Sequence, residues 1–140
     1  MSEPYGPSVD LAVAKTTAAA ALDEARKNQW QMAVAVVDPS GNLTYFEKMD
    51  GTQLGSVTVS IDKARSAALF KRPTRVFQDT IAAGGDGLRV LRLAAAIPIE
   101  GGLPLVVGGA IVGAIGVSGG TSAQDGQCAE AGVRALSRSK

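Results

Sequence analysis

The sequence contains no histidine among its 140 residues. Histidine is the usual general base near neutral pH and the commonest metal ligand, so its absence excludes Ser-His-Asp and Cys-His catalytic sites. Catalysis by this chain would need carboxylates, lysine, tyrosine, hydroxyl groups or a bound cofactor. The single cysteine, Cys128, excludes an internal disulfide and is consistent with a reducing compartment.

Aromatic residues are also scarce, with one tryptophan, two tyrosines and three phenylalanines. The 14 basic residues barely exceed the 13 acidic ones, so no basic surplus points to nucleic acid or to a charged membrane surface. Gly and Pro interrupt the apolar runs, which are too short to span a bilayer, and the first residues do not resemble a signal peptide. We therefore expect a cytoplasmic protein that binds neither nucleic acid nor membrane.

The length is typical of one domain, which we expect to cover residues 1–140. Apolar residues at three- and four-residue spacings predict four helices, with Ser8 and Ser122 as the N-caps of the first and last. These helices are expected over residues 8–28, 54–70, 74–81 and 122–138. Asp125 lies three residues after Ser122, the spacing of a capping box.

Short apolar runs between turn residues predict strands. They cover residues 32–37, 43–49, 103–107 and 110–117, and a fifth short strand is expected within 88–99. The DPSGN turn at 38–42 and the Gly108-Gly109 turn indicate hairpins. Hairpins, rather than alternating βα units, predict an α/β (α+β) fold in which helices cover a five-stranded antiparallel sheet.

Glycine is concentrated in IEGGLPLVVGGAIVGAIGVSGG, residues 99–120, where strands are expected. Glycine weakens a strand and offers no side chain to the core. Two explanations are open: a helix or partner subunit packs too closely for a Cβ, or a ligand lies against bare backbone. The stretch from Ser118 to Thr121, at the start of the last helix, would suit an anion because free N–H groups point outward at a helix N-terminus.

Two segments, VVDPSGNLTYFEKMDGTQLGSVTVSIDKARSAALFKRPT and GGLPLVVGGAIVGAIGVSGGTSAQD, together resemble the GlcG/HbpS family, also called the haem-degrading domain family. That family includes the C-terminal domain of PduO-type proteins, and the resemblance covers nearly the whole chain. The matching positions are Asp38, Gly41, Lys48, Met49, Asp50, Ser56, Lys63, Arg65, Pro73, Gly101, Gly102, Pro104, Gly113, Gly116, Ser118, Gly119 and Asp125. The resemblance implies a profilin-like fold, binding of haem or a related small molecule, and a homo-oligomer, a dimer or larger.

This chain departs from family members that ligate haem iron through histidine. Haem remains a candidate ligand, but its iron would need a lysine or one of Tyr5, Tyr45, Met32, Met49, Cys128 and Thr121. The leading hypothesis is a protein that binds haem or another anionic small molecule. The alternative is a cofactor-free enzyme of the isomerase, tautomerase, lyase or hydrolase type, acting on a small carboxylate or enol substrate in a catabolic pathway.

The expected ligand site lies at one end of the sheet. Gly101 and Gly102 precede one strand, and Ser118 and Gly119 follow its hairpin partner, so the two pairs should meet. The predicted ligand-binding residues are Ser56, Lys63, Gly101, Gly102, Pro104, Ser118, Gly119 and Thr121. Lys63 would hold the anion, and in the enzyme alternative Lys63, Glu100 and Asp125 form the catalytic set. No metal site is predicted.

Overall fold

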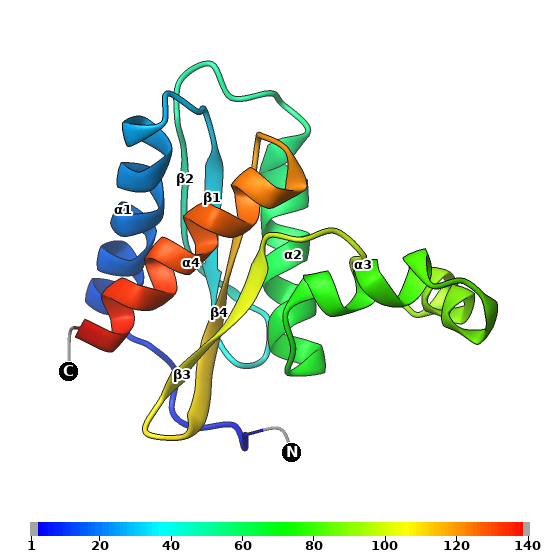
Figure 1. The fold of residues 1–140 in the computed structure, drawn as a ribbon. Helices are drawn as coiled ribbons and strands as arrows, with labels where there is room; N and C mark the ends of the chain where they lie inside the picture. Colours follow the sequence, from blue (N-terminus) through cyan, green and yellow to red (C-terminus); the bar gives the residue numbers. More distant parts are fainter. Residues whose placement is uncertain (1–2, 139–140) are drawn as a thin grey trace.

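In a computed structural model that describes residues 3–138, a four-stranded antiparallel sheet carries helices on both faces (Figure 1). The strands lie in the order β2-β1-β4-β3. In chain order the elements are α1 (Leu11–Lys27), β1 (Ala33–Val37), β2 (Leu43–Lys48), α2 (Ser56–Phe70), α3 (Thr74–Ala82), the 3₁₀ helix η1 (Gly85–Arg92), β3 (Gly102–Val107), β4 (Ala110–Ser118) and α4 (Ser122–Arg138). The predicted combination of helices with an antiparallel sheet is confirmed.

The predicted fifth strand is wrong: the described chain has four. Residues 88–99 complete η1 and then run as an irregular connection to β3. Leu88 and Leu91, three residues apart, suit a 3₁₀ helix, which has three residues per turn. Pro98 has no N–H to donate to a neighbouring strand. The glycine-rich residues 85–87 form the start of η1.

Two predicted helix caps are also wrong. Asp10, not Ser8, caps α1, because its carboxylate accepts the Val13 N–H at 2.8 Å. At α4 the reciprocal bonds of a capping box join Thr121 and Gln124 rather than Ser122 and Asp125. The Thr121 hydroxyl oxygen accepts the Gln124 N–H at 3.1 Å, and the Gln124 side-chain oxygen accepts the Thr121 N–H at 3.0 Å. Asp125 is therefore not needed as a cap.

The two faces of the sheet are covered by different helices (Figure 1). Val34 and Val36 of β1 pack into the core formed with α1 and α4, whereas Ala35 and Val37 pack into the smaller core beneath α2. Since both faces are covered, every residue of β1 is buried. This accounts for the uninterrupted apolar run that the sequence shows at this strand.

Glycines on the α2 face allow that helix to lie directly on the sheet. A Cβ on Gly116 would contact the Ser60 carbonyl oxygen and lie 2.5 Å from the Ala64 nitrogen, both backbone atoms of α2. A Cβ on Gly102 would contact the Lys63 carbonyl oxygen. At these two positions the close packing of a helix explains the glycine. Across residues 3–138, no helix combines the length and apolar character needed to cross a membrane.

Candidate functional site

Lys63 of α2 and Asp125, in the first turn of α4, form an ion pair inside the protein. The Lys63 Nζ lies 2.7 Å from Asp125 Oδ2 and also donates to the Val117 carbonyl at 3.0 Å. The two side chains are 1% and 4% exposed. The structure thus brings two predicted site residues together, but each neutralises the charge of the other.

The carboxylate of Asp125 is bonded on both oxygens. Its Oδ1 accepts the Gly120 N–H at 2.9 Å, so it also holds the turn before α4. Burial raises the pKa of Asp125, while the hydrogen bond and charge of Lys63 and the backbone N–H groups of Gly120 and Gly119 oppose that rise. Since these partners connect α2, β4 and α4, the ion pair ties together three elements that are distant in sequence.

The backbone at Gly101 covers this ion pair. The Gly101 carbonyl accepts the Val117 N–H at 2.9 Å, and a Cβ on Gly101 would lie 2.8 Å from the Lys63 Nζ. Gly101 has a φ of +133°, a conformation that favours glycine. We name the region formed by Lys63, Gly101, Val117 and Asp125 the closed corner, because the chain itself fills the space beside the ammonium group.

Other predicted site residues lie around the closed corner. The Ser56 and Ser118 hydroxyl oxygens are 3.0 Å apart and buried. Gly102 pairs with Gly116 in the sheet, and Pro104 lies farther along β3, opposite Ala114.

Glu100 lies half-buried beside α4. Its N–H donates to the Gln78 side-chain oxygen at 2.8 Å, and a Cβ on Gly126 would contact its carboxylate. The ligand-binding and catalytic roles of these residues stay predictions. A ligand could reach Lys63 only after its pair with Asp125 opened.

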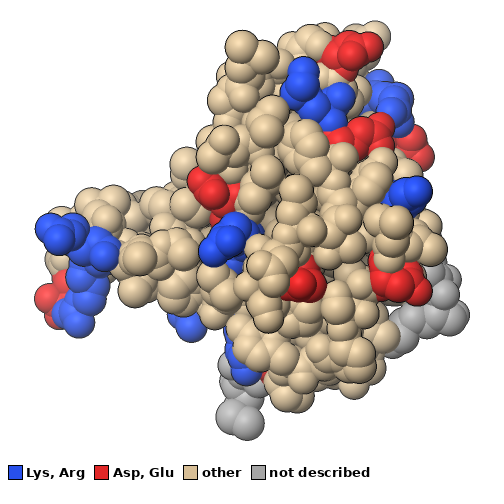
Figure 2. All heavy atoms as spheres, turned by 180° about the vertical axis from the view of Figure 1, so that it is seen from behind, with Lys and Arg blue, Asp and Glu red and all other residues tan. Residues whose placement is uncertain are grey.

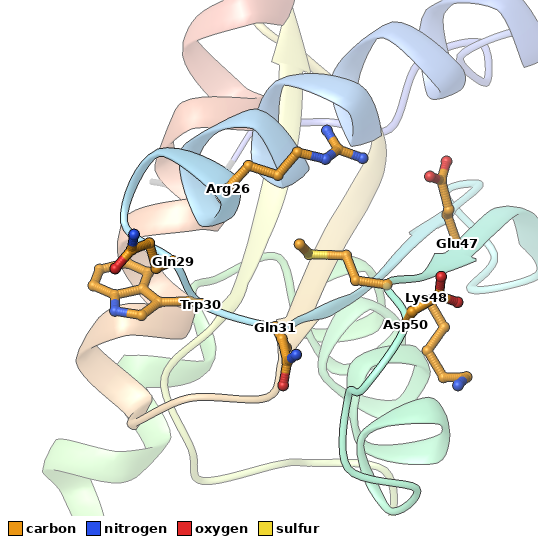
Figure 3. Close-up of a pocket in the computed structure, with 8 residues that line it drawn as sticks. Arg26, Gln29, Trp30, Gln31, Glu47, Lys48 and Asp50 are labelled. Atoms are coloured by element: carbon orange, nitrogen blue, oxygen red, sulfur yellow. The ribbon is translucent and has the colours of Figure 1, made fainter.

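An open hollow of about 600 Å³ lies at the same end of the sheet, beside β1 and β2 (Figure 3). We name it the Trp30 hollow. It is lined by residues from the end of α1, the connection to β1 and the end of β2. These are Arg26, Gln29, Trp30, Gln31, Glu47, Lys48, Met49 and Asp50. In Figure 3, Trp30 and Gln29 lie on one side, Lys48 and Asp50 on the other, and Arg26 extends from α1 above them.

Two hydrogen bonds between Met49 and Met32, the residue before β1, hold the floor of the hollow in place. The Met49 sulfur accepts the Met32 N–H at 3.3 Å, and the Met49 N–H donates to the Met32 carbonyl at 3.0 Å. Trp30 and Met49 both pack against the core beneath α1 and α4. The hollow therefore has a fixed apolar floor, with charged side chains around it.

The charged side chains differ in how they are held. Glu47 accepts the Tyr45 hydroxyl at 2.6 Å, and Arg26 pairs with Asp23 at 2.9 Å on the surface. Lys48 and Asp50 are exposed. An exposed pair such as Arg26–Asp23 contributes little and can exchange partners, so Arg26 and Lys48 are both positioned to meet an anion.

A second hollow of about 270 Å³ adjoins the first and shares Trp30 and Gln31 with it. Its other lining residues include Gly119 and Gly120, from the turn before α4. Of the predicted ligand-binding residues, Gly119 therefore borders open space, next to the exposed Thr121.

Sequence reasoning missed Arg26 and Trp30 as site residues, and it treated Lys48 only as a match to the family pattern. The hairpin register was the signal that could have found them. Ala33 pairs with Lys48, so the only tryptophan in the chain, three residues before Ala33, comes close to the Lys48-Met49-Asp50 triplet.

The donors at the Trp30 hollow fit the organic part of a haem better than its iron. In the described part of the chain, no three His, Cys, Asp or Glu side chains cluster to hold a metal ion. Cys128 is buried, and burial, with the charges of Glu24 and Asp125, raises the pKa of its thiol to about 12. Met49 is the candidate iron ligand at the hollow, and its sulfur already accepts a hydrogen bond.

Comparison with known proteins gives consistent results. The family model described as haem degrading protein HbpS-like matches residues 9–134. Protein GlcG of Escherichia coli K12 is 38% identical over 106 residues, which cover 76% of this chain and 78% of GlcG. The crystal structure of Klebsiella pneumoniae protein ORFY superimposes with a TM-score of 0.86 at 31% identity, covering 94% of this chain and 92% of that chain. A PduOC–haem complex gives 0.82 at 26% identity, covering 91% and 94%.

Proposed function

The chain belongs to the HbpS-like family of haem-degrading proteins, and on this basis we propose that it binds a flat, anionic small molecule of the haem type in the Trp30 hollow. The observation that carries the proposal is the combination of an indole with two cationic side chains, Arg26 and Lys48, around one open hollow. Its volume of about 600 Å³ lies within the range usual for small-molecule sites.

Each part of such a ligand has a counterpart in the hollow. The Trp30 indole offers a flat aromatic face, against which a planar ring can stack. The Arg26 guanidinium and the Lys48 ammonium can pair with the carboxylates of the ligand. Asp50 and Glu47, the latter hydrogen-bonded to the Tyr45 hydroxyl, are the lining carboxylates that such an anion must avoid.

A haem complex of a related protein supports a ligand of the haem type, and the absence of histidine from this chain indicates which part of that ligand would be bound. The PduOC structure, which shares the fold, is a complex with haem. This chain has no histidine, and the donors at its hollow are weak for iron. We therefore expect the porphyrin ring and its carboxylates to supply most of the affinity, with little contribution from the metal.

The test compares haem with iron-free protoporphyrin IX. Trp30 is the only tryptophan, so quenching of its fluorescence reports binding of either compound to the protein. We expect both compounds to quench it, each saturating at one molecule per chain, with dissociation constants within about tenfold of each other, equivalent to 1.4 kcal/mol. Binding of haem alone would show that an iron ligand dominates, and no quenching by either compound would overturn the proposal.

A pair of variants ties binding to the hollow. Arg26→Gln should weaken binding by up to about fivefold, because an exposed ion pair contributes up to about 1 kcal/mol. Lys15→Gln, an exposed change on α1 outside the hollow, is the matched control and should leave the affinity unchanged. Equal affinities for wild type and Arg26→Gln would place the ligand elsewhere.

The enzyme alternative, with Lys63, Glu100 and Asp125 as the catalytic set, has weaker support. A general acid or base must come within hydrogen-bond reach of the proton it transfers. Lys63 and Asp125 are buried and bonded to each other, whereas the Trp30 hollow is open. We therefore assign the ligand to the Trp30 hollow and assign to the closed corner the structural role of holding α2, β4 and α4 together.

A further inference from the structure

The segment that joins α2 to β3 forms an arm that projects from the rest of the protein (Figure 1). We define the arm as residues 71–97; it contains α3 and η1. Its interior is a small cluster of Phe77, Val90 and Ala96. Because so few residues are buried within it, the arm has little core of its own.

The arm is nonetheless held in place at its base. The Ile97 N–H donates to the Ser66 hydroxyl of α2 at 3.0 Å, and the rings of Phe70 and Phe77 meet edge to face at 5.5 Å. These contacts fix the two ends of the arm against α2. The arm thus presents a defined surface.

That surface is apolar along one side of η1. Leu88 and Leu91 are 48% and 65% exposed, and their three-residue spacing places them on the same side of a 3₁₀ helix. Leu93, which follows η1, is exposed as well. Exposed clusters of large apolar side chains on soluble proteins mark interaction surfaces.

Charge indicates what covers the arm. The arm has five basic and two acidic residues, a net charge of +3, whereas the rest of the chain has nine basic and eleven acidic residues, a net charge of −2. In Figure 2 basic side chains dominate the tip of the arm, and the acidic side chains on this face lie mostly on the body. Two arms would repel each other, so the complementary surface is the body of another copy.

The body offers an apolar groove of about 370 Å³ between the N-terminal segment, the β3–β4 turn and the end of α4. Val9, Val13, Val107, Val112 and Leu136 line the groove, and Asp10 supplies an acidic group beside them. In Figure 1 the arm and the groove-forming elements lie on different sides of the protein, so an arm does not reach its own groove.

We propose that the arm docks in this groove on a second copy of the chain, with Leu88 and Leu91 against its apolar wall and Arg89 and Arg92 toward Asp10. Because the arm and the groove are different surfaces, the contact is heterologous: each copy offers its arm to one neighbour and its groove to another, and the assembly closes as a ring when the rotation between copies permits. This inference does not depend on the ligand proposed above.

Disulfide trapping tests the contact directly. Cys128 is buried, so introduced thiols are the accessible ones. A mixture of Leu91→Cys and Ala110→Cys, the second at the groove, should yield a covalent dimer under mild oxidation. Leu91→Cys mixed with Ala19→Cys, an exposed position of α1, is the control and should yield at least tenfold less. Efficient crosslinking of Leu91→Cys to itself, or equal yields in both mixtures, would overturn the proposal.

Assembly in solution gives an independent readout. Light scattering at micromolar concentration should report at least two chains for the wild type. Leu91→Asp should raise the dissociation constant of the assembly more than tenfold. Leu54→Asp is a matched control, since Leu54 is 82% exposed but lies outside the arm and the groove, and it should assemble as the wild type does. A monomeric wild type, or an unchanged assembly for Leu91→Asp, would refute the docking.

Discussion

Two regions at one end of the sheet contain charged side chains, but in one the charges are buried and paired, and in the other they are exposed around an open space. In the closed corner, Lys63 and Asp125 pair with each other beneath the backbone of Gly101. In the Trp30 hollow, Arg26 and Lys48 stay near the surface around an open space. The difference lies in what covers each region, because α2 lies directly on the glycines of β3 and β4, whereas a connecting segment borders the hollow.

The comparison shows that charge near a glycine-rich motif does not by itself indicate a ligand site. Removing a lysine and an aspartate from water costs free energy, which their attraction offsets only when geometry and hydrogen bonding are good. The 2.7 Å contact, the Val117 carbonyl and the Gly120 N–H meet those requirements for Lys63 and Asp125. The closed corner is thus built to hold elements together.

The largest effect is expected from breaking the closed corner. Lys63→Met keeps an unbranched chain of similar length but leaves the Asp125 carboxylate buried without its partner. Removing one member of a buried pair costs about 3–5 kcal/mol of unfolding free energy. Urea denaturation measures this loss, and Lys15→Met, on the exposed side of α1, should stay within about 0.5 kcal/mol of the wild type.

A double variant separates lost charge from lost packing. Replacing both members of a buried pair with apolar residues is often neutral, since no unpaired charge is left. Lys63→Met combined with Asp125→Leu should therefore recover most of the stability lost by the single change. A single variant as stable as the wild type would contradict the structural role assigned to this pair.

Local signals in the sequence were enough for most of the fold. The spacing of apolar residues located α1 and α2, and the turn residues at 38–42 located the first hairpin. The two helix-cap predictions failed because several residues able to cap a helix lie close together in the sequence. Asp10 and Thr121 each lie one or two residues from the predicted caps, and local sequence does not rank them. Within the arm, the helix expected at 74–81 is present, whereas the strand expected within 88–99 is not, because the leucines there recur without a decisive period.

The candidate site was harder to predict for a different reason. In the structure Gly101 and Lys63 both bond to Val117, the residue before Ser118. Whether that meeting point is open or filled depends on how closely α2 approaches the sheet, which is a property of tertiary packing. The Trp30 hollow depends in turn on the register between β1 and β2, which brings residues 26–31 beside residues 47–50.

A smaller loss is expected from forcing α2 away from the sheet. Gly116→Ala places a methyl group against the Ser60 carbonyl and the Ala64 nitrogen, and overpacking of this kind costs about 1–3 kcal/mol. The matched control is Gly55→Ala, because Gly55 has a helical φ of −62° and no neighbouring atom within 4 Å of a new Cβ. Thermal unfolding should separate the two variants, and equal melting temperatures would mean that α2 shifts without cost.

Substitutions of the charged residues at the Trp30 hollow are expected to change stability least. Their effect on ligand affinity tests the proposed function. Lys48→Gln removes a cation and Asp50→Asn removes an anion from two nearby exposed positions, so both should stay within about 0.5 kcal/mol of wild-type stability. For an anionic ligand their effects on affinity should have opposite signs. Lys48→Gln should weaken protoporphyrin binding about two- to fivefold, and Asp50→Asn should strengthen it by a similar factor.

Salt and a distant charge change complete this test. Exposed charges are screened over about 8 Å at physiological ionic strength, so added salt should shrink both affinity changes together. Glu130→Gln, on the exposed side of α4 and outside the hollow, should alter neither affinity nor stability. Changes of the same sign for Lys48→Gln and Asp50→Asn would show that charge at the hollow does not select the ligand. Opposite signs with unchanged stability would distinguish a binding surface from the closed corner, where loss of one charge is expected to cost about 3–5 kcal/mol of unfolding free energy.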